Sequence, residues 1–512
     1  SFNFSHCFLK NIMSTCEKWR IFSQTLKGPS EGNPFVDVKL TAIFSGPNER
    51  IEKEGFYNGN GNYIIRLMPT EEGDWNYITK SNVKELDQKT GSFKVTPPTG
   101  NNHGRVLLKN DVYPLGPLTD YHSEKEFHFC YEDKTKYLPF GTTCYAWIHQ
   151  KPEICSQTIE SLKNSPFNKI RMCIFPKHYT YNTTDPDRYP FEGTRDKGFD
   201  FTRFNIEFYE DLERRIQQLD ELQIQADIIL FHPYDNWGFS TMTKEQDNFY
   251  LKYTISRLCS FKNIWWSLAN EYDLIREKSV EDWERLARVV IRFDPYGHLR
   301  SIHECFSFYD YTKPWITHCS IQRIDIYKTS EATTEWRQLY HKPIVVDECA
   351  YEGNINYGWG NIDGEEMTRR FWEACIRGGY LTHGEVYVDK GDQVWWSHGG
   401  ILHGTCTDRI AFCRKIFEEA PDDLQPLKLT IENHLANWDV PCSHVGNKYF
   451  LYYFGFFRPC FRTYQLPEGH KYEIEIIDTW EMTINKLPGT FSGDIKIDLP
   501  QKKFIAIRMK EV

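Results

Sequence analysis

Three stretches of the sequence with different hydrophobic patterns predict an α/β fold: a (β/α)8 TIM barrel flanked by an N-terminal β-sandwich and a small C-terminal β-sandwich. The first stretch alternates apolar and polar residues with a period of two. The middle stretch alternates short apolar runs with amphipathic helical segments, and the last returns to period-two strands. We place the three predicted domains at residues 13–100, 101–424 and 425–512.

The two outer domains are predicted from short alternating segments separated by Gly, Pro and Asn. Strands with this period, and with turns at this spacing, are typical of antiparallel sandwiches. The segments of the first domain include residues 36–44, 62–69, 74–81 and 91–97. From about Leu427 the same pattern returns and predicts the second β domain.

The barrel is predicted from eight apolar runs that alternate with helices over about 300 residues, the usual size of this fold. The runs are residues 136–147, 168–175, 224–231, 262–270, 299–304, 315–322, 342–348 and 379–387. The helices are expected at residues 207–222, 244–259, 280–293, 333–341, 364–378 and 408–420. A doubly wound open sheet is the competing fold, but no GxGxxG motif or P-loop follows the first run.

Composition excludes some partners. The net charge of −10 and the lack of a basic stripe argue against nucleic acid, and no apolar run is long enough to span a membrane. The fifteen cysteines are scattered without a CxxC pair, which predicts reduced thiols, a cytoplasmic location and no metal or other cofactor. Residues 1–12 do not resemble a signal peptide, so Met13 is a candidate natural start. The sequence gives no indication of the oligomeric state.

The strongest candidates for chemistry are two carboxylates at predicted strand ends. Glu271 follows Asn270 at the end of the fourth run, and Glu348 ends the seventh. The carboxyl ends of barrel strands meet at one rim, where active sites are found. Glycoside hydrolysis needs a carboxylic acid that protonates the leaving oxygen and, in retaining enzymes, a second carboxylate that attacks the anomeric carbon. Taken alone, Glu271 could equally be a helix-capping or salt-bridging residue.

Further residues near the predicted strand ends are candidates for binding sugar hydroxyls or sugar faces. Strand alternation places Asp347 on the opposite face from Glu348, where it would anchor a loop or helix. Arg171, within the second run, could keep the nucleophile ionised by charge pairing. Each of the binding candidates could instead be a structural residue: Asn270, Trp147, His178, His232, Asp235, His318, His383, Glu385, Trp395 and Trp396.

An Asn–Glu pair after the fourth strand with a Glu after the seventh resembles clan A of the retaining glycoside hydrolases. Other segments resemble the apiosidase-like group of bacterial glycosidases, which carries N- and C-terminal β-sandwich domains. These segments are FGTTCYAW (140–147), WSLANEYDL (266–274), VVDECAYEGNINYGWGN (345–361), GGYLTHGE (378–385), WWSHGGILHG (395–404), GNPFVDV (32–38) and GFYNGNGNYIIRLMPTEEGDW (55–75). Trp395 and Trp396 depart from the clan pattern, because they follow the eighth strand on a loop.

The resemblance implies a retaining glycoside hydrolase that cleaves oligosaccharides by double displacement. In this mechanism Glu271 is the acid/base, Glu348 the nucleophile and Asn270 a ligand of the 2-hydroxyl group. The long segments 178–203 and 349–363 could wall in a pocket and favour exo-action. Two other functions are open: a non-catalytic carbohydrate-binding protein on the same scaffold, and a metal-dependent barrel hydrolase. The first strand offers CYAW and not the HxH pair that the latter usually carries.

Overall fold

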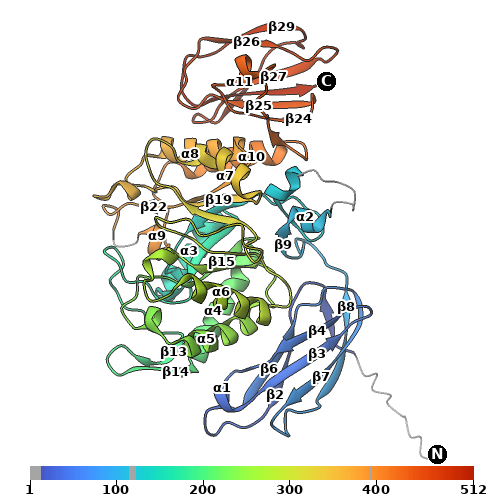
Figure 1. The fold of residues 1–512 in the computed structure, drawn as a ribbon, viewed down its shortest axis with the longest axis vertical. Helices are drawn as coiled ribbons and strands as arrows, with labels where there is room; N and C mark the ends of the chain where they lie inside the picture. Colours follow the sequence, from blue (N-terminus) through green and yellow to red (C-terminus); the bar gives the residue numbers. More distant parts are fainter. Residues whose placement is uncertain (1–12, 115–122, 392–393) are drawn as a thin grey trace, which may run out of the picture.

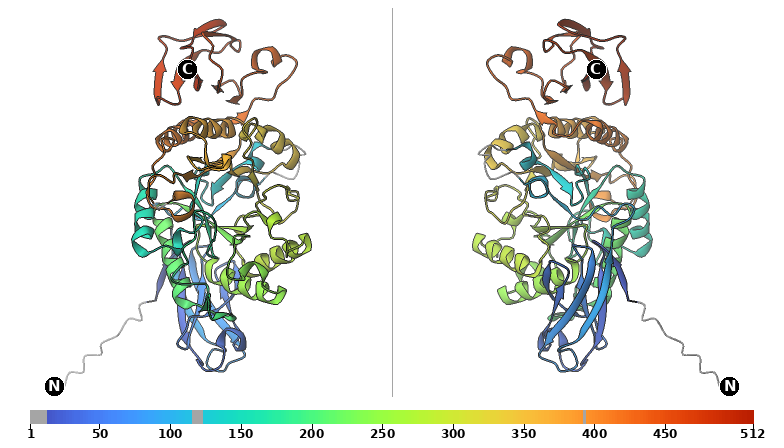
Figure 2. Two further views of the ribbon diagram at one scale, coloured as in Figure 1. Left: turned by 90° about the vertical axis from the view of Figure 1, so that its left-hand side faces the viewer. Right: turned by 90° about the vertical axis from the view of Figure 1, so that its right-hand side faces the viewer.

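The computed structural model describes residues 13–114, 123–391 and 394–512. The hypothesis that the natural chain starts at Met13 concerns residues outside this range. The barrel lies between the two β domains, with the N-terminal domain at one end of the molecule and the C-terminal domain at the other (Figure 1). Figure 2 shows the same order from two further sides.

The central sheet is the predicted barrel. Its eight strands pair in parallel in the order β17-β16-β15-β12-β11-β21-β19-β18. A bridge between His303 and Ser320 joins the two end strands and closes the cylinder. Each predicted run contains one of these strands: β11 (Phe140–Thr143), β12 (Lys169–Cys173), β15 (Gln225–Phe231), β16 (Ile264–Ala269), β17 (Arg300–Ser301), β18 (Cys319–Gln322), β19 (Ile344–Glu348) and β21 (Tyr380–His383).

Helices surround the barrel, and the six predicted ones are present. They are α4 (Ile206–Glu221), α5 (Lys244–Leu258), α6 (Val280–Phe293), α7 (Thr333–Tyr340), α8 (Gly364–Ile376) and α10 (Thr407–Glu419). The helix α3 (Pro152–Lys163) was not predicted. Only Cys155, Thr158 and Leu162 of α3 are buried, so its apolar stripe is too weak to read from the sequence.

The N-terminal β domain contains two sheets that share one core, which includes Phe44, Ile65 and Trp75. One sheet has the order β1-β8-β7-β3-β4 and the other β2-β6-β5. The strands are β1 (Thr15–Glu17), β2 (Phe22–Lys27), β3 (Leu40–Ser45), β4 (Arg50–Glu54), β5 (Phe56–Tyr57), β6 (Asn62–Leu67), β7 (Gly73–Ser81) and β8 (Thr90–Thr96).

The C-terminal β domain packs a six-stranded sheet, in the order β23-β24-β25-β30-β27-β28, against the pair β26-β29. Its strands are β23 (Gln425–Pro426), β24 (Cys442–Val445), β25 (Tyr449–Tyr453), β26 (Phe461–Gln465), β27 (Tyr472–Asp478), β28 (Thr483–Lys486), β29 (Asp494–Asp498) and β30 (Ile505–Glu511). The predicted fold class, a barrel with β-rich flanking regions, is therefore confirmed.

Short elements complete the chain. The strand pairs are β9 (Val106–Leu108) with β10 (Phe129–Tyr131), β13 (Phe191–Thr194) with β14 (Gly198–Phe204), and β20 (Glu352–Gly353) with β22 (Glu385–Val386). The short helices are α1 (Pro34–Asp37), α2 (Lys109–Val112), α9 (Trp395–His398) and α11 (His434–Asn437). Among the described residues, no helix is both long and apolar enough to cross a membrane.

Buried ion pairs fill the barrel interior below its mouth. The Lys169 ammonium lies 2.9 Å from an oxygen of Asp227 and 2.8 Å from an oxygen of Asp347, and all three side chains are almost fully buried. Ser320 and Thr382 also donate hydrogen bonds to Asp347. Burial alone would raise the pKa of Asp347, but Lys169 and Arg171 hold it well below its usual range.

Removing Lys169 should therefore destabilise the fold strongly. The substitution Lys169→Met leaves Asp227 buried without its cation and Asp347 with only the more distant Arg171, and we expect a loss of about 3–5 kcal/mol of unfolding free energy. Urea unfolding measures this loss. The matched control is Lys151→Met, which breaks the exposed Lys151–Asp187 pair and should cost less than about 1 kcal/mol. Equal effects of the two substitutions would contradict this account of the barrel interior.

Candidate active site

Glu271 lies immediately after β16, at the carboxyl end of the barrel. Its backbone adopts a left-handed conformation with φ of 52°, which is strained for a residue other than glycine. The backbone N–H of Glu271 donates to Nδ1 of His303 (3.2 Å), and its carboxylate accepts a hydrogen bond from the Tyr234 hydroxyl. These contacts hold the strained turn and fix the direction of the Glu271 side chain.

Glu348 reaches the same mouth because β19 contains an irregularity. Val346 pairs with Ile321 of β18, but the next pair joins Glu348 to Gln322, so Asp347 is an extra residue in β19. Such a bulge breaks the alternation of side chains. Among the described residues, the side-chain hydrogen bonds of Asp347 join it to Lys169, Ser320 and Thr382 of barrel strands, and the prediction that it anchors a loop or helix is wrong.

One amide group bridges the two carboxylates. In the orientation that satisfies both acceptors, the side-chain nitrogen of Gln322 donates to Glu271 Oε1 over 3.0 Å and to Glu348 Oε2 over 2.7 Å. Because both oxygens bond to one atom, they lie no more than 5.7 Å apart. Both glutamates are largely buried, with 5% and 8% of their surface exposed. The two acidic side chains thus face one small space.

A network from the first two barrel strands supports Glu348. The Tyr145 hydroxyl, just after β11, donates to Glu348 and lies 3.2 Å from the side-chain oxygen of Asn270. Arg171 on β12 donates to Tyr145 (2.6 Å) and Asn270 (2.9 Å), and one of its nitrogens lies 3.8 Å from Glu348. The predicted pairing of Arg171 with Glu348 is therefore present in the structure, partly through Tyr145.

The same network fixes the amide of Asn270. Its oxygen accepts a hydrogen bond from Arg171 and lies 3.2 Å from the Tyr145 hydroxyl, so its nitrogen points the other way. In the described part of the chain that nitrogen has no hydrogen-bond partner. It is thus available to a ligand beside Glu271, as a contact with a sugar hydroxyl requires.

The environment of Glu271 favours its protonated form. Burial and, second, the nearby charge of Glu348 together raise the pKa of the Glu271 carboxyl to about 7. The hydrogen bond from Tyr234 and the charge of Lys177 act in the opposite direction. A carboxyl with this pKa can exchange a proton near neutral pH, which a general acid must do.

A third buried carboxyl, Glu304, stands beside the pair. Its Oε1 accepts the backbone N–H of Gln322 over 2.7 Å, and burial, followed by the neighbouring acidic groups, raises the pKa of Glu304 to about 9. Glu304 is therefore uncharged at neutral pH and positions the residue that bridges the catalytic candidates.

We expect Glu304→Gln to be nearly silent. It replaces one neutral, hydrogen-bonding side chain by another of the same shape, so kcat/KM should change by less than about threefold between pH 5 and 8. A pH profile of the variant checks this. A loss of two orders of magnitude would mean that Glu304 acts in its ionised form.

Aromatic rings line the space around the carboxylates. Tyr145, Tyr351 and Trp396 belong to one buried cluster, against which Tyr179 and Trp359 pack. Trp395 points the other way, into the main core, and its indole N–H donates to Thr142. Of the two neighbouring tryptophans that were predicted as a sugar platform, the structure thus brings Trp396 to the site and removes Trp395 from it.

Most other predicted binding residues form scaffold contacts, which corrects the expectation that they face a sugar. His318 precedes β18 at the opposite end of the barrel and packs on Phe129 and Trp265. Asp235 accepts hydrogen bonds from three backbone N–H groups of its own loop, and Glu385 accepts two from residues 403 and 404.

Three of the four remaining predicted binding residues are also buried in the scaffold. His232 is held between Phe175 and Tyr234, so it shapes the loop that carries Tyr234. His383 and Trp147 are fully buried, and Trp147 lies in the main core. His178 is half-buried on the loop after β12, with its ring 6.4 Å from Trp237, and its role as a sugar ligand stays a prediction.

Sequence reasoning missed three residues beside the two carboxylates, Tyr145, Lys177 and Tyr234, and it placed Gln322 at a strand end without giving it a role. Tyr145 and Gln322 stand at predicted strand ends, so a wider reading of that rule includes them. Lys177 and Tyr234 lie on loops, where strand alternation gives no direction for a side chain. The hydroxyl groups of Tyr145 and Tyr234 are each bonded to one catalytic candidate, a relation that only the folded chain reveals.

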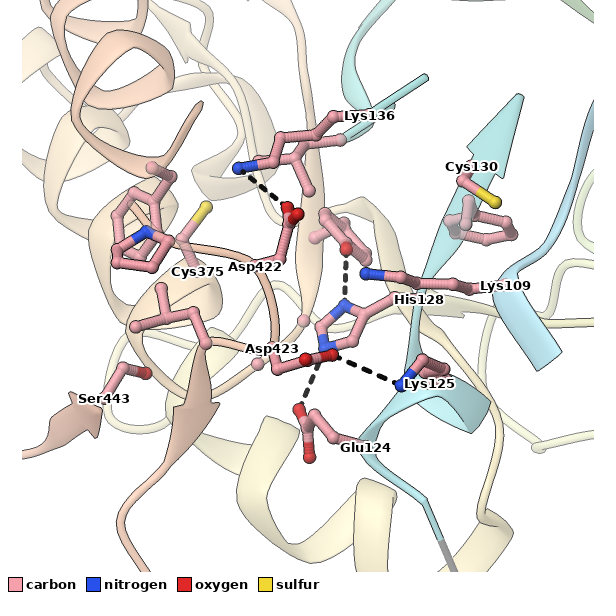
Figure 3. Close-up of a pocket in the computed structure, with 18 of the residues that line it drawn as sticks. Lys109, Glu124, Lys125, His128, Cys130, Lys136, Cys375, Asp422, Asp423 and Ser443 are labelled. Atoms are coloured by element: carbon pink, nitrogen blue, oxygen red, sulfur yellow. Dashed lines mark hydrogen bonds and ion pairs between the residues drawn. The ribbon is translucent and has the colours of Figure 1, made fainter. Parts of the chain in front are cut away.

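A cavity lies at the other end of the barrel. It has a volume of about 340 Å³ and adjoins the beginnings of β11 and β21. Several of its charged groups are paired: His128 bonds to Glu124, Lys125 pairs with Asp423, and Lys136 pairs with Asp422 (Figure 3). In the parts of the chain that the structure describes, no group of three or more His, Cys, Asp and Glu side chains is placed to share a metal ion.

Two solved structures that share this fold are described as glycoside hydrolases. A crystal structure of a "putative glycoside hydrolase" from Bacteroides vulgatus is 36% identical, with a TM-score of 0.89, and the match covers 98% of this chain and 100% of that one. A glycoside hydrolase family 5 protein from the same organism shares the fold at 14% identity, with a TM-score of 0.59 and coverage of 79% and 95%. The chain therefore shares its fold with glycoside hydrolase structures, and it matches the first of them over nearly its whole length.

The family follows from the central domain. The model for the apiosidase-like catalytic domain matches residues 123–409, more than half of the chain, and the chain belongs to this family. Two domains of unknown function flank it, DUF5060 at residues 15–82 and DUF5605 at residues 438–510. Comparison with curated proteins gives no match. The resemblance drawn from the sequence is confirmed for family and fold.

Proposed function

We propose that the protein hydrolyses a glycosidic bond of an oligosaccharide with retention of anomeric configuration. The observation that carries the proposal is the bridge by Gln322, which keeps one oxygen of Glu271 within 5.7 Å of one oxygen of Glu348. Retaining glycosidases hold their carboxyl groups about 5–5.5 Å apart, whereas inverting ones need about 6.5–9.5 Å to admit a water molecule. The separation supports direct attack by a carboxylate.

Each carboxyl group then has one role in each half of the reaction. Glu271, protonated because burial raises its pKa to about 7, gives its proton to the leaving oxygen while Glu348 attacks the anomeric carbon. The bond to the leaving group breaks and an ester of Glu348 forms. Glu271, now ionised, removes a proton from water, and the resulting hydroxide displaces Glu348 from the sugar. Two inversions at one carbon give net retention.

Contacts around the pair support these roles. The nitrogen of Asn270 is available to donate to the 2-hydroxyl group, and Arg171 and Tyr145 stabilise the negative charge of Glu348. Trp396 packs against Tyr145, the residue that donates to Glu348, and so supports the wall of the site. The small exposed fractions of Glu271 and Glu348 favour a closed site that accepts a chain end, so we include exo-action in the proposal.

The experiment that tests the proposal is a screen of 4-nitrophenyl glycosides in both anomeric configurations. Proton NMR of the first product should show the same anomer as the substrate. A 2-deoxy-2-fluoro analogue of the best substrate should inactivate the protein and add one sugar mass to the peptide that contains Glu348. An initial product of the opposite anomer, or a label on another residue, contradicts the proposed mechanism.

The pH dependence of the wild-type protein gives a second test. Glu271 must be protonated at the start of the reaction, so kcat/KM should fall as the pH rises above about 7. Initial rates at low substrate concentration between pH 4 and 9 measure this limb. A profile that is still rising at pH 8 would contradict the assignment of Glu271 as the acid.

A further inference from the structure

Lys177 occupies an aromatic cage beside the two catalytic candidates. It lies on the loop after β12 and is 4% exposed. Its ammonium nitrogen is 4.0 Å from the centre of the Trp396 ring, 4.1 Å from that of Tyr145 and 4.6 Å from that of Tyr234. The two tyrosines are those whose hydroxyl groups donate to Glu348 and Glu271. Lys177 therefore lies between the supports of both carboxylates.

The hydrogen-bonding capacity of this ammonium is unused. Within residues 13–114, 123–391 and 394–512, it has no hydrogen bond and no ion pair. Other buried lysines of the chain differ: Lys169 pairs with two aspartates, Lys278 lies 3.1 Å from Asp247, and Lys53 donates to the backbone oxygen of Ser256. Ring faces attract a cation, but they leave its three N–H donors without an acceptor.

Buried donors without acceptors are costly, so their position needs a physical reason. Rings cover the ammonium of Lys177 on several sides, and the charges of Glu348 and Glu271 attract it toward the space between them. Burial lowers the pKa of Lys177 only to about 8, so it carries its charge at neutral pH. The missing acceptors must come from whatever fills that space.

We propose that Lys177 is a substrate-binding residue whose ammonium donates hydrogen bonds to an oxygen substituent of the sugar held between Glu271 and Glu348. The inference rests on the proposed function in that it places a sugar between these residues. A hydroxyl group and a sugar carboxylate share the required acceptor chemistry, and substrates that differ in one substituent distinguish them. Lys177 thereby selects sugars that carry this oxygen in the right position.

The test pairs Lys177→Met with matched substrates. The 4-nitrophenyl glucoside, glucuronide and xyloside differ only in the group on C5, and monodeoxy analogues of the best substrate remove each hydroxyl group in turn. We expect kcat/KM to fall roughly 10- to 100-fold on substrates that carry the bound oxygen, the value of a charged hydrogen bond, and less than about twofold on the analogue that lacks it. A loss confined to the glucuronide identifies a carboxylate. An equal loss on every substrate and analogue overturns the contact.

Two control variants separate this role from a structural one. Lys177→Arg keeps a cation with N–H donors and should recover part of the lost activity on the same substrate. Lys53→Met removes a buried ammonium far from the site, where it bonds to residues of α5 and its end, and should leave the substrate preference unchanged. A change of preference in Lys53→Met as large as in Lys177→Met would overturn the inference.

A binding measurement distinguishes failure of this inference from failure of the proposed function. Calorimetry with the monosaccharide of the best glycoside compares Glu348→Gln with the double variant Glu348→Gln/Lys177→Met, and neither protein needs to turn over. A 10-fold weaker affinity of the double variant supports the contact even if retention or the role of Glu348 proves wrong. Equal affinity, or no binding by either protein, overturns the role of Lys177.

Discussion

The substitution Glu348→Gln is expected to reduce kcat by roughly 10⁴-fold or more, as the loss of a catalytic nucleophile does elsewhere. Glutamine keeps the shape of the side chain and can still bond to Tyr145, but its amide cannot attack the anomeric carbon. Stopped assays with the best 4-nitrophenyl glycoside measure the loss, and thermal unfolding shows whether the fold is kept.

A matched control is available just after the end of β17, two strands away from Glu348 around the barrel. Glu304→Gln makes the same chemical change in a buried carboxyl that accepts a hydrogen bond from the backbone of Gln322. Its activity should stay near that of the wild type, because Glu304 is already neutral. Similar losses in the two variants would show that buried charge in general, and not nucleophilic attack, explains the effect.

Chemical rescue identifies the nucleophile among the acidic residues. In Glu348→Ala the side chain is replaced by space, and azide can attack the anomeric carbon from the face that Glu348 occupied. The product is then a glycosyl azide of inverted configuration, detected by NMR. The contrary outcome is that azide restores no turnover to Glu348→Ala but restores it to a variant of another acidic residue, again with an inverted glycosyl azide as product. That result would assign the role of nucleophile to the other residue.

The barrel was predictable because its strands are buried on all sides. In the seventh run, residues 344–346 are apolar and Asp347 and Glu348 follow directly, so both the strand and the polar groups at its end are visible in the sequence. Asn270, Glu271 and Glu348 were found by that rule. The helix α3 escaped because so few of its residues are buried and apolar.

The binding residues were less predictable, for two physical reasons. A bulge at Asp347 breaks the alternation that is used to predict which face of a strand each side chain lies on. Nothing in the sequence of residues 344–348 indicates this bulge. Loops use polar side chains to satisfy their own backbone, so Asp235 and Glu385 look like ligands in the sequence but hold N–H groups in the fold. Conversely, nothing in the sequence distinguishes Tyr234 and Lys177 from other loop residues, and only the folded structure places them at the mouth of the barrel.

The substitution Glu271→Gln is expected to reduce kcat/KM by about 10²- to 10⁴-fold on substrates with poor leaving groups, which is the usual contribution of general acid catalysis. The loss should be smaller for 4-nitrophenyl and larger for alkyl or sugar leaving groups, because good leaving groups need no proton. The variant should also lose the alkaline limb near pH 7, since no group with that pKa titrates in it. The same loss for every leaving group would contradict the role of acid.

The two roles of Glu271 depend on Glu348, and the pH profile can show this. Burial is the largest cause of the raised pKa of Glu271, and the charge of Glu348 is the second. Formation of the glycosyl ester removes that charge, so the pKa of Glu271 falls in the intermediate, where Glu271 must act as a base. When hydrolysis of the ester limits the rate, the acidic limb of kcat should therefore lie at a lower pH than the alkaline limb of kcat/KM.

Steady-state rates at saturating and at low substrate concentration measure both limbs. A kcat that falls away below pH 7 would mean that the pKa does not change, and that Glu348 has no electrostatic control over its partner.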